Sequence, residues 1–219
     1  MAATVSRVHD IKTARAKIVG DSPLITHRYV NRRKDVPVDV SMKEPTPLEE
    51  FISGIYWITD EIKFPGSTQA AAGARNAKTL DEFLLACSKG VRFGIPAVVI
   101  KTAAIDAAAK ILKNVPTKVS ARSLFFIRDE GVPDGLVEIK AGAPAMREDL
   151  LRIGDGAPFS RYRPMFTPWS CEFDITYDAG SEKTLEEILK MINCGGATQG
   201  IGEWRKARGG TYGAFHVEY

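Results

Sequence analysis

Apolar and polar residues alternate along several short stretches of the chain, which is the pattern of β-strands with one buried face. The alternation is clearest from Trp169 to Tyr177 and less regular from Ile11 to Gly20. In the first stretch, one face carries Cys171, Phe173, Ile175 and Tyr177. Two more strands are predicted at 123–128 (SLFFIR) and 136–140 (LVEIK), joined by a turn at 131–135, and a last strand at 213–219.

A spacing of three and four positions between apolar residues predicts helices elsewhere. The clearest helix spans residues 96–112, with proline at its start and small alanines that would let it lie close to a sheet. Residues 79–87 show the same spacing, as does a second stretch that Ser181 or Thr184 would cap and that runs through Asn193. Gly195-Gly196 is expected to end this second helix.

The segments between these elements are less regular. Asp21-Ser22-Pro23 resembles a helix cap ahead of residues 24–34, and Pro47 resembles a helix start ahead of residues 51–60. Residues 65–78 are rich in Ala, Gly, Ser and Gln, which favours an inserted loop with at most a weak helix.

The clear elements follow the order strand, helix, strand pair, strand, helix, strand. This is the βαββαβ pattern of a ferredoxin-like domain, the core that RRM domains also have. We therefore predict an α+β fold in which residues 1–219 form a single domain with a ferredoxin-like core. Residues 35–80, approximately, are predicted to be a loop and helical insertion.

The composition and net charge of the chain limit the classes of function that it can have. The 219 residues can bury a core without disulfides or metals, and Cys87, Cys171 and Cys194 are too far apart for a CxxC motif. We expect reduced thiols, a cytoplasmic location, no membrane partner and no cofactor. The net charge of +3 is small, so an argument for nucleic-acid binding must rest on where the basic residues lie.

The C-terminal segment QGIGEWRKARGGTYGAFHVEY concentrates three features that suit nucleic acid. Glycines allow backbone amides to approach an anion, arginines and lysines bind phosphate, and exposed aromatic rings stack on bases. The residues concerned are Gly200, Gly202, Trp204, Arg205, Lys206, Arg208, Gly209, Gly210 and Tyr212. The alternative is a hairpin with ordinary turn glycines, solvated arginines and Trp204 packed on the core. The segment lacks the Gly-Lys-Ser/Thr of a Walker A loop.

Other basic runs could extend this surface. The first cluster contains Arg28, Arg32 and Arg33, and a second run contains Arg161 and Arg163. A third run contains Arg147 and Arg152, which we expect to pair with Glu148, Asp149 or Asp155, because ion pairs are the common fate of such exposed charges.

The three histidines, His9, His27 and His216, have no cysteine or carboxylate at metal-ligand spacing, so no metal site is predicted. His27 lies in the first basic cluster and could act as a general base on an RNA 2′-hydroxyl, although a contact or capping role is commoner.

Long motifs of the chain resemble a family. The runs SPLITHRY, MREDLLRIG, RYRPMFTPW and GIGEWRKARGGTYGAFHV are similar to an uncharacterised group of bacteriophage proteins with the C-terminal pattern G-(I/V)-GEWRP-x-x-GG-x-(F/Y)-G-x-F-x-V. The resemblance covers most of residues 20–34 and 90–219, but not about 35–80. The chain departs from the pattern at Lys206, where proline is usual, and at Ala214, where arginine is common.

That phage group is in turn similar to the RAMP superfamily of CRISPR proteins in its fold pattern and in the position of its glycine-rich loop. The resemblance implies ferredoxin-like protomers that lie side by side along a single strand, each gripping a few nucleotides. Fold alone does not establish function.

The sequence therefore supports three competing hypotheses for the function. The first is a non-enzymatic, phage-encoded protein that binds single-stranded DNA or RNA, acting as a homo-oligomer in the host cytoplasm. The second is a metal-independent ribonuclease that uses His27 as its base. The third is a phage protein that binds and inhibits a host protein complex through Trp204 and its neighbours, or that takes part in assembly, since Trp and Arg are enriched at protein interfaces.

Overall fold

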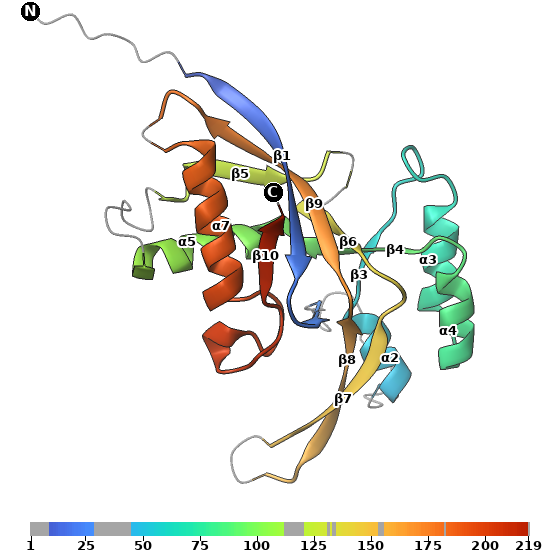
Figure 1. Cartoon of the computed structure of the whole chain (residues 1–219). Helices are drawn as coiled ribbons and strands as arrows, with labels where there is room; N and C mark the ends of the chain where they lie inside the picture. The colour runs from blue at the N-terminus through green and yellow to red at the C-terminus, as the bar shows by residue number, and fades with distance from the viewer. Residues whose placement is uncertain are drawn as a thin grey trace, which may run out of the picture.

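The structure of the chain is a computed structural model. It describes residues 9–28, 45–111, 121–130, 132, 135–152, 156–181 and 183–218. The described chain has an α+β fold built around a seven-stranded sheet with the strand order β10-β1-β9-β6-β4-β3, in which β5 also pairs with β9 (Figure 1). The strands are β1 (Ile11–Gly20), β3 (Tyr56–Ile58), β4 (Arg92–Pro96), β5 (Phe125–Arg128), β6 (Leu136–Lys140), β9 (Ser170–Asp178) and β10 (Phe215–Glu218).

Strands β1 and β9 form the centre of this sheet. They pair antiparallel from Ile11 opposite Asp178 to Val19 opposite Ser170. The predicted alternation in β9 is confirmed at Cys171, Phe173 and Ile175, which are all fully buried. A strand with this inner face is fixed in register, because a slip by one residue would turn its apolar side chains to solvent.

The predicted pairing of residues 123–128 with 136–140 is wrong. Strands β5 and β6 form where expected, but they do not pair with each other: β5 pairs with β9 from Asp174 to Tyr177, and β6 pairs with β9 at Ser170 and Cys171. The long strand β9 thus holds two short strands end to end on one edge. Alternation predicts strands but does not specify their partners.

A second sheet of three strands continues from the first. Its order is β2-β8-β7, with β2 at Leu24–Ile25, β7 at Ala145–Leu151 and β8 at Phe159–Phe166. The chain passes from β1 to β2, from β6 to β7 and from β8 to β9, so the hairpin of β7 and β8 projects beyond the main sheet (Figure 1). Sequence reasoning missed β7 and β8 and treated them only as charged runs.

The helix predicted after Asp21-Ser22-Pro23 is also wrong, because the chain enters strand β2 there. The side chains expected to cap a helix bind the last strand instead. Ser22 Oγ accepts a hydrogen bond from the Ala214 amide (3.0 Å), and the Asp21 carboxylate lies 2.6 Å from His216 Nδ1. A cap residue is equally able to bind a distant amide, which local sequence does not reveal.

The helices agree better with the sequence pattern. They are α2 (Pro47–Ser53), α3 (Ser67–Arg75), α4 (Leu80–Cys87), α5 (Ala97–Ile111) and α7 (Leu185–Thr198). The helix starting at Pro47 has a Thr46–Glu49 capping box, but it ends at Ser53 and strand β3 follows, so a helix through residues 51–60 is wrong. The segment read mainly as a loop at 65–78 contains α3. None of the described helices is long and apolar enough to cross a membrane.

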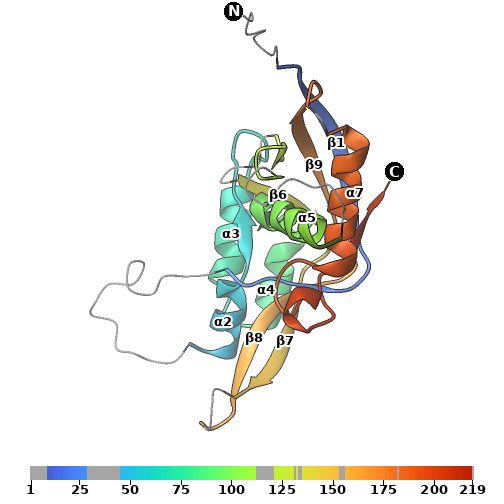
Figure 2. The same ribbon diagram turned by 90° about the vertical axis from the view of Figure 1, so that its left-hand side faces the viewer.

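Helix α7 does not end at Gly195-Gly196, as the sequence suggested, but continues to Thr198. The glycines allow close packing instead. A Cβ atom on Gly195 would lie 2.7 Å from the Ala104 nitrogen of α5, and one on Gly196 would lie 2.0 Å from the Phe215 carbonyl oxygen of β10. Helices α5 and α7 consequently cross in contact with each other in front of the sheet (Figure 2). The small residues bring α5 against α7 as well as against the core.

A matched pair of glycine variants tests this packing. Gly196→Ala is expected to destabilise the protein by about 1–3 kcal/mol, because the added methyl group must displace backbone. Gly73→Ala in α3 is the control, since its Cβ would meet only Ala86 at an ordinary 3.8 Å. The free energy of unfolding of this control variant should rise by up to about 1 kcal/mol, because alanine has a higher helix propensity than glycine. Urea denaturation measures both, and equal stabilisation by the two variants would contradict the close contact.

Candidate nucleic-acid interface

The segment that connects α7 to β10, residues 199–214, is called the glycine loop below. It folds back on itself through backbone hydrogen bonds: Ile201 donates to Gly213, and Tyr212 donates to Trp204. It is also joined to the β2 segment, because Glu203 donates to the Ile25 carbonyl at 2.9 Å. The loop is therefore held from within and from the side, and it presents a fixed surface.

The glycines of the loop serve this folding directly. A Cβ atom on Gly213 would lie 1.8 Å from the Ile201 oxygen, and one on Gly202 would lie 2.3 Å from the Ile25 oxygen. Gly200 and Gly210 likewise face loop backbone, whereas the space beside Gly209 is open. The predicted contact of these glycines with phosphate stays a prediction, since most of them are already required by the packing of the loop.

Trp204 is an exposed residue of the loop with an unusual backbone conformation. The residue is 40% exposed, so it is not packed wholly on the core. Its φ of 51° is the one positive φ among the described residues other than glycine. A left-handed backbone costs a residue with a side chain roughly 1–2 kcal/mol. Strain of this kind concentrates at functional sites, so the displayed indole is the first candidate for a ligand contact.

The basic side chains of the loop, and the Tyr212 ring, differ in which groups they contact. Arg205 donates to the Gly202 carbonyl (3.0 Å), and Lys206 donates to the Ala197 carbonyl at the end of α7 (2.8 Å). Arg208 is exposed and forms no ion pair with any described residue. Tyr212 is not exposed as a free stacking face, because the Arg147 guanidinium lies 4.7 Å from the centre of its ring and also donates to its hydroxyl.

Three arginines of the β7–β8 hairpin are paired with carboxylates, whereas Arg152 forms no ion pair with a described residue, and Asp155 lies outside the described residues. Arg161 Nη1 lies 2.6 Å from Glu50 Oε1 in α2, and the side chain of Arg163 is only 12% exposed, between Asp149 and Glu203. Arg147 pairs with Asp149 at 2.7 Å, as the sequence predicted. These ion pairs join the hairpin to α2 and to the glycine loop, and they leave Arg163 little surface for a ligand.

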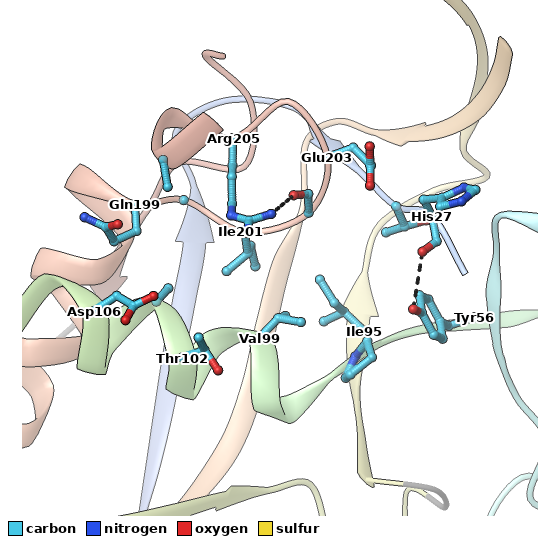
Figure 3. Close-up of a pocket in the computed structure, with 16 residues that line it drawn as sticks. His27, Tyr56, Ile95, Val99, Thr102, Asp106, Gln199, Ile201, Glu203 and Arg205 are labelled. Carbon is cyan, nitrogen blue, oxygen red and sulfur yellow. Dashed lines mark hydrogen bonds between the residues drawn. The ribbon is translucent and has the colours of Figure 1, made fainter. Parts of the chain in front are cut away.

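A cavity of about 270 Å³ lies between the glycine loop and α5 (Figure 3). Val99, Thr102 and Asp106 of α5 line one side, and Ile201 and Arg205 line the other. Its volume is near the lower end of ligand pockets, which occupy about 300–1,000 Å³. The wall is partly apolar and partly polar, which suits a flat heteroaromatic group better than a bare anion.

His27 and Tyr56 close one end of this cavity, where the Tyr56 hydroxyl donates to the His27 carbonyl at 3.4 Å (Figure 3). Burial by the surrounding chain lowers the pKa of His27, and Glu203, which acts in the opposite direction, contributes less. His27 is therefore largely neutral at pH 7. Arg28 is exposed beside it, whereas Arg32 and Arg33 lie outside the described residues.

Sequence reasoning missed the part of the site that α5 and β3 contribute. Asp106 lies within an alanine-rich helix, and Tyr56 lies in a segment that was expected to be helical. Asp106 is the one acidic residue in residues 96–112, and that was the available signal. Both residues reach the loop only because distant strands place them there.

Within the described parts of the chain, no cluster of three or more His, Cys, Asp or Glu residues could hold a metal ion. Comparisons of the sequence with family models and with curated proteins gave no match. The assignment of function therefore rests on the site itself.

The backbone strain at Trp204 can be measured by comparing two replacements. At an ordinary position an alanine variant is as stable as a glycine variant or more so, but at a positive φ the order reverses. We expect Trp204→Gly to be more stable than Trp204→Ala by about 1 kcal/mol. Thermal or urea unfolding of the two variants gives the difference, and a more stable alanine variant would show that the left-handed conformation is absent.

Proposed function

We propose that this chain is a phage-encoded, non-enzymatic protein that binds single-stranded nucleic acid in the host cytoplasm, as a homo-oligomer. In this proposal the domain is ferredoxin-like and related to the RAMP superfamily. The strand order β10-β1-β9 followed by β5 and β6 supports that relation, as do α5 ahead of β5 and α7 between β9 and β10.

The main observation behind the proposal is that the glycine loop holds Trp204 exposed at the surface. A large aromatic ring is held exposed on a strained backbone, within a loop whose other residues are fixed by hydrogen bonds. A loop whose backbone is already held loses little backbone freedom when a base stacks on its ring. Stacking on an aromatic ring tolerates any base, since every base has a π-face.

Charges near Trp204 supply the second part of the interface. Arg208 is exposed on the η2 turn (Lys206–Arg208), directly after Trp204 and Arg205 in the loop. Arg28 is exposed and directly follows His27, which lines the cavity. Arg161, Arg163 and Tyr212 hold the hairpin and the loop together, so we assign them a positioning role beside any contact that they make.

Binding should depend on Trp204 and Arg208 in different ways. Trp204→Ala should weaken binding of oligo-dT or oligo-U by the roughly 1–3 kcal/mol of one stacked base, with little change in salt dependence. Arg208→Ala should weaken binding and lower the slope of log affinity against log salt by about 0.7, the value of one phosphate contact on a single strand. Fluorescence anisotropy over a salt series measures both quantities.

Arg128→Ala is the matched control, because Arg128 is exposed on β5 and does not line the cavity beside the glycine loop. It should leave affinity and slope unchanged. Failure of the unaltered protein to bind any oligonucleotide would overturn the proposal, and capture of a host protein by the same Trp204 surface would support the inhibitor function in its place.

A ribonuclease remains the second candidate, and the position of His27 favours it. His27 lines the end of the cavity beside the glycine loop, with its ring directed outward (Figure 3), and its lowered pKa favours the neutral form that a general base requires. Labelled RNA incubated in EDTA distinguishes the functions. RNA that is shifted in a gel but stays intact supports binding alone, whereas cleavage that His27→Ala abolishes and that His27→Gln does not restore supports the enzyme.

A further inference from the structure

A second cavity, of about 310 Å³, lies on the other side of Tyr56 from the glycine loop. Its described lining includes two arginines and two aromatic residues but no carboxylate. The lining residues are Arg28, Tyr56, Trp57, Thr59, Arg75, Pro96 and Leu136. A concave surface with two guanidinium groups and no acidic residue is suited to an anion.

Arg75 is placed in this cavity by the packing beneath it. It lies in the last turn of α3, and its guanidinium carbon is 5.3 Å from the centre of the Trp57 ring. Trp57 is held in turn by Phe83 of α4 and Phe93 of β4, at 6.4 and 5.9 Å between ring centres. The guanidinium group therefore rests on a ring that is itself fixed.

The charges of Arg75 and Arg28 are not neutralised by other parts of the described chain. Neither side chain forms an ion pair with a described carboxylate. The pKa of Arg75 is lowered first by burial and second by the charge of Arg28, so the two like charges act on each other across the cavity. Like charges that face one another without a counterion are relieved by a bound anion.

The two cavities share part of their walls. Tyr56 and Pro96 line both of them, so the surface runs from the glycine loop, past the Tyr56 ring, to Arg28 and Arg75. Burial raises the pKa of Tyr56, and its hydroxyl is already bound to the His27 carbonyl. Tyr56 thus lies between the two cavities, so a strand that contacts both would pass over it.

We propose that Arg75 and Arg28 form a phosphate subsite that holds the sugar-phosphate backbone of the strand whose base stacks on Trp204. This inference rests on the proposed function and extends it to a second contact point beyond the glycine loop. Arg75 becomes a binding residue from a segment that the sequence offered only as an insertion. The subsite would be occupied only by strands long enough to reach from Trp204 past Tyr56.

Length-dependent binding tests the subsite. Anisotropy titrations of labelled oligo-dT and oligo-U, from dinucleotides to decanucleotides, are compared for the unaltered protein, Arg75→Met and Arg75→Lys. Arg75→Met keeps the contact with Trp57 but removes the charge. We expect it to weaken binding of the longer strands about threefold to tenfold and to lower their salt slope by about 0.7. The shortest strands that bind should be unaffected, and Arg75→Lys should recover most of the slope.

Arg28→Met and the double variant form a mutant cycle with Arg75→Met. If both arginines hold one phosphate, the double variant should lose little more affinity than either single variant. An unchanged affinity and slope in Arg75→Met, with Trp204→Ala still impaired, would overturn the subsite and leave the proposed function standing. Failure of the unaltered protein to bind any strand would overturn both, and Arg128→Ala again controls for general loss of charge.

Discussion

The antiparallel pairing of β1 with β9 is the constraint on which the rest of the structure depends. Both strands continue beyond the main sheet, because β1 leads to β2 and β9 is preceded by β8. The register that places Val19 opposite Ser170 therefore also places Leu24 opposite Phe166. A slip by one residue would expose the apolar face of β9 and would also move the β2 segment away from the glycine loop.

This constraint explains how a rigid loop arises at the surface. The glycine loop has one anchor in α7 and β10. Its second anchor is the backbone of β2 and of the residue before it, at Ile25 and Pro23. Its close approaches of backbone to backbone exclude side chains at several glycines. The strain at Trp204, of about 1–2 kcal/mol, is offset by hydrogen bonds that each contribute about 0.5–1.5 kcal/mol. A loop held in this way can present an indole with little loss of freedom on binding.

The basic residues fall into two groups, those that form ion pairs and those that do not, and the sequence does not distinguish the groups. Arg161 and Arg163 are adjacent to carboxylates from other elements and serve mainly to join the hairpin to its surroundings. Arg28, Arg75 and Arg208 have no such described partner. Near-neutral net charge is thus compatible with a local basic surface, since the acidic residues are used elsewhere in the fold.

The sequence by itself determined most strands and helices of the core, because burial of one face imposes a period of two or 3.6 residues that can be read locally. It also identified the loop that carries Trp204. Only the tertiary structure decided which strands pair, why α7 continues through Gly195-Gly196, and which arginines lie free of carboxylates. Those outcomes depend on contacts between residues far apart in the chain, such as Ala104 with Gly195 and Arg75 with Trp57, and a one-dimensional pattern carries no information on such distances.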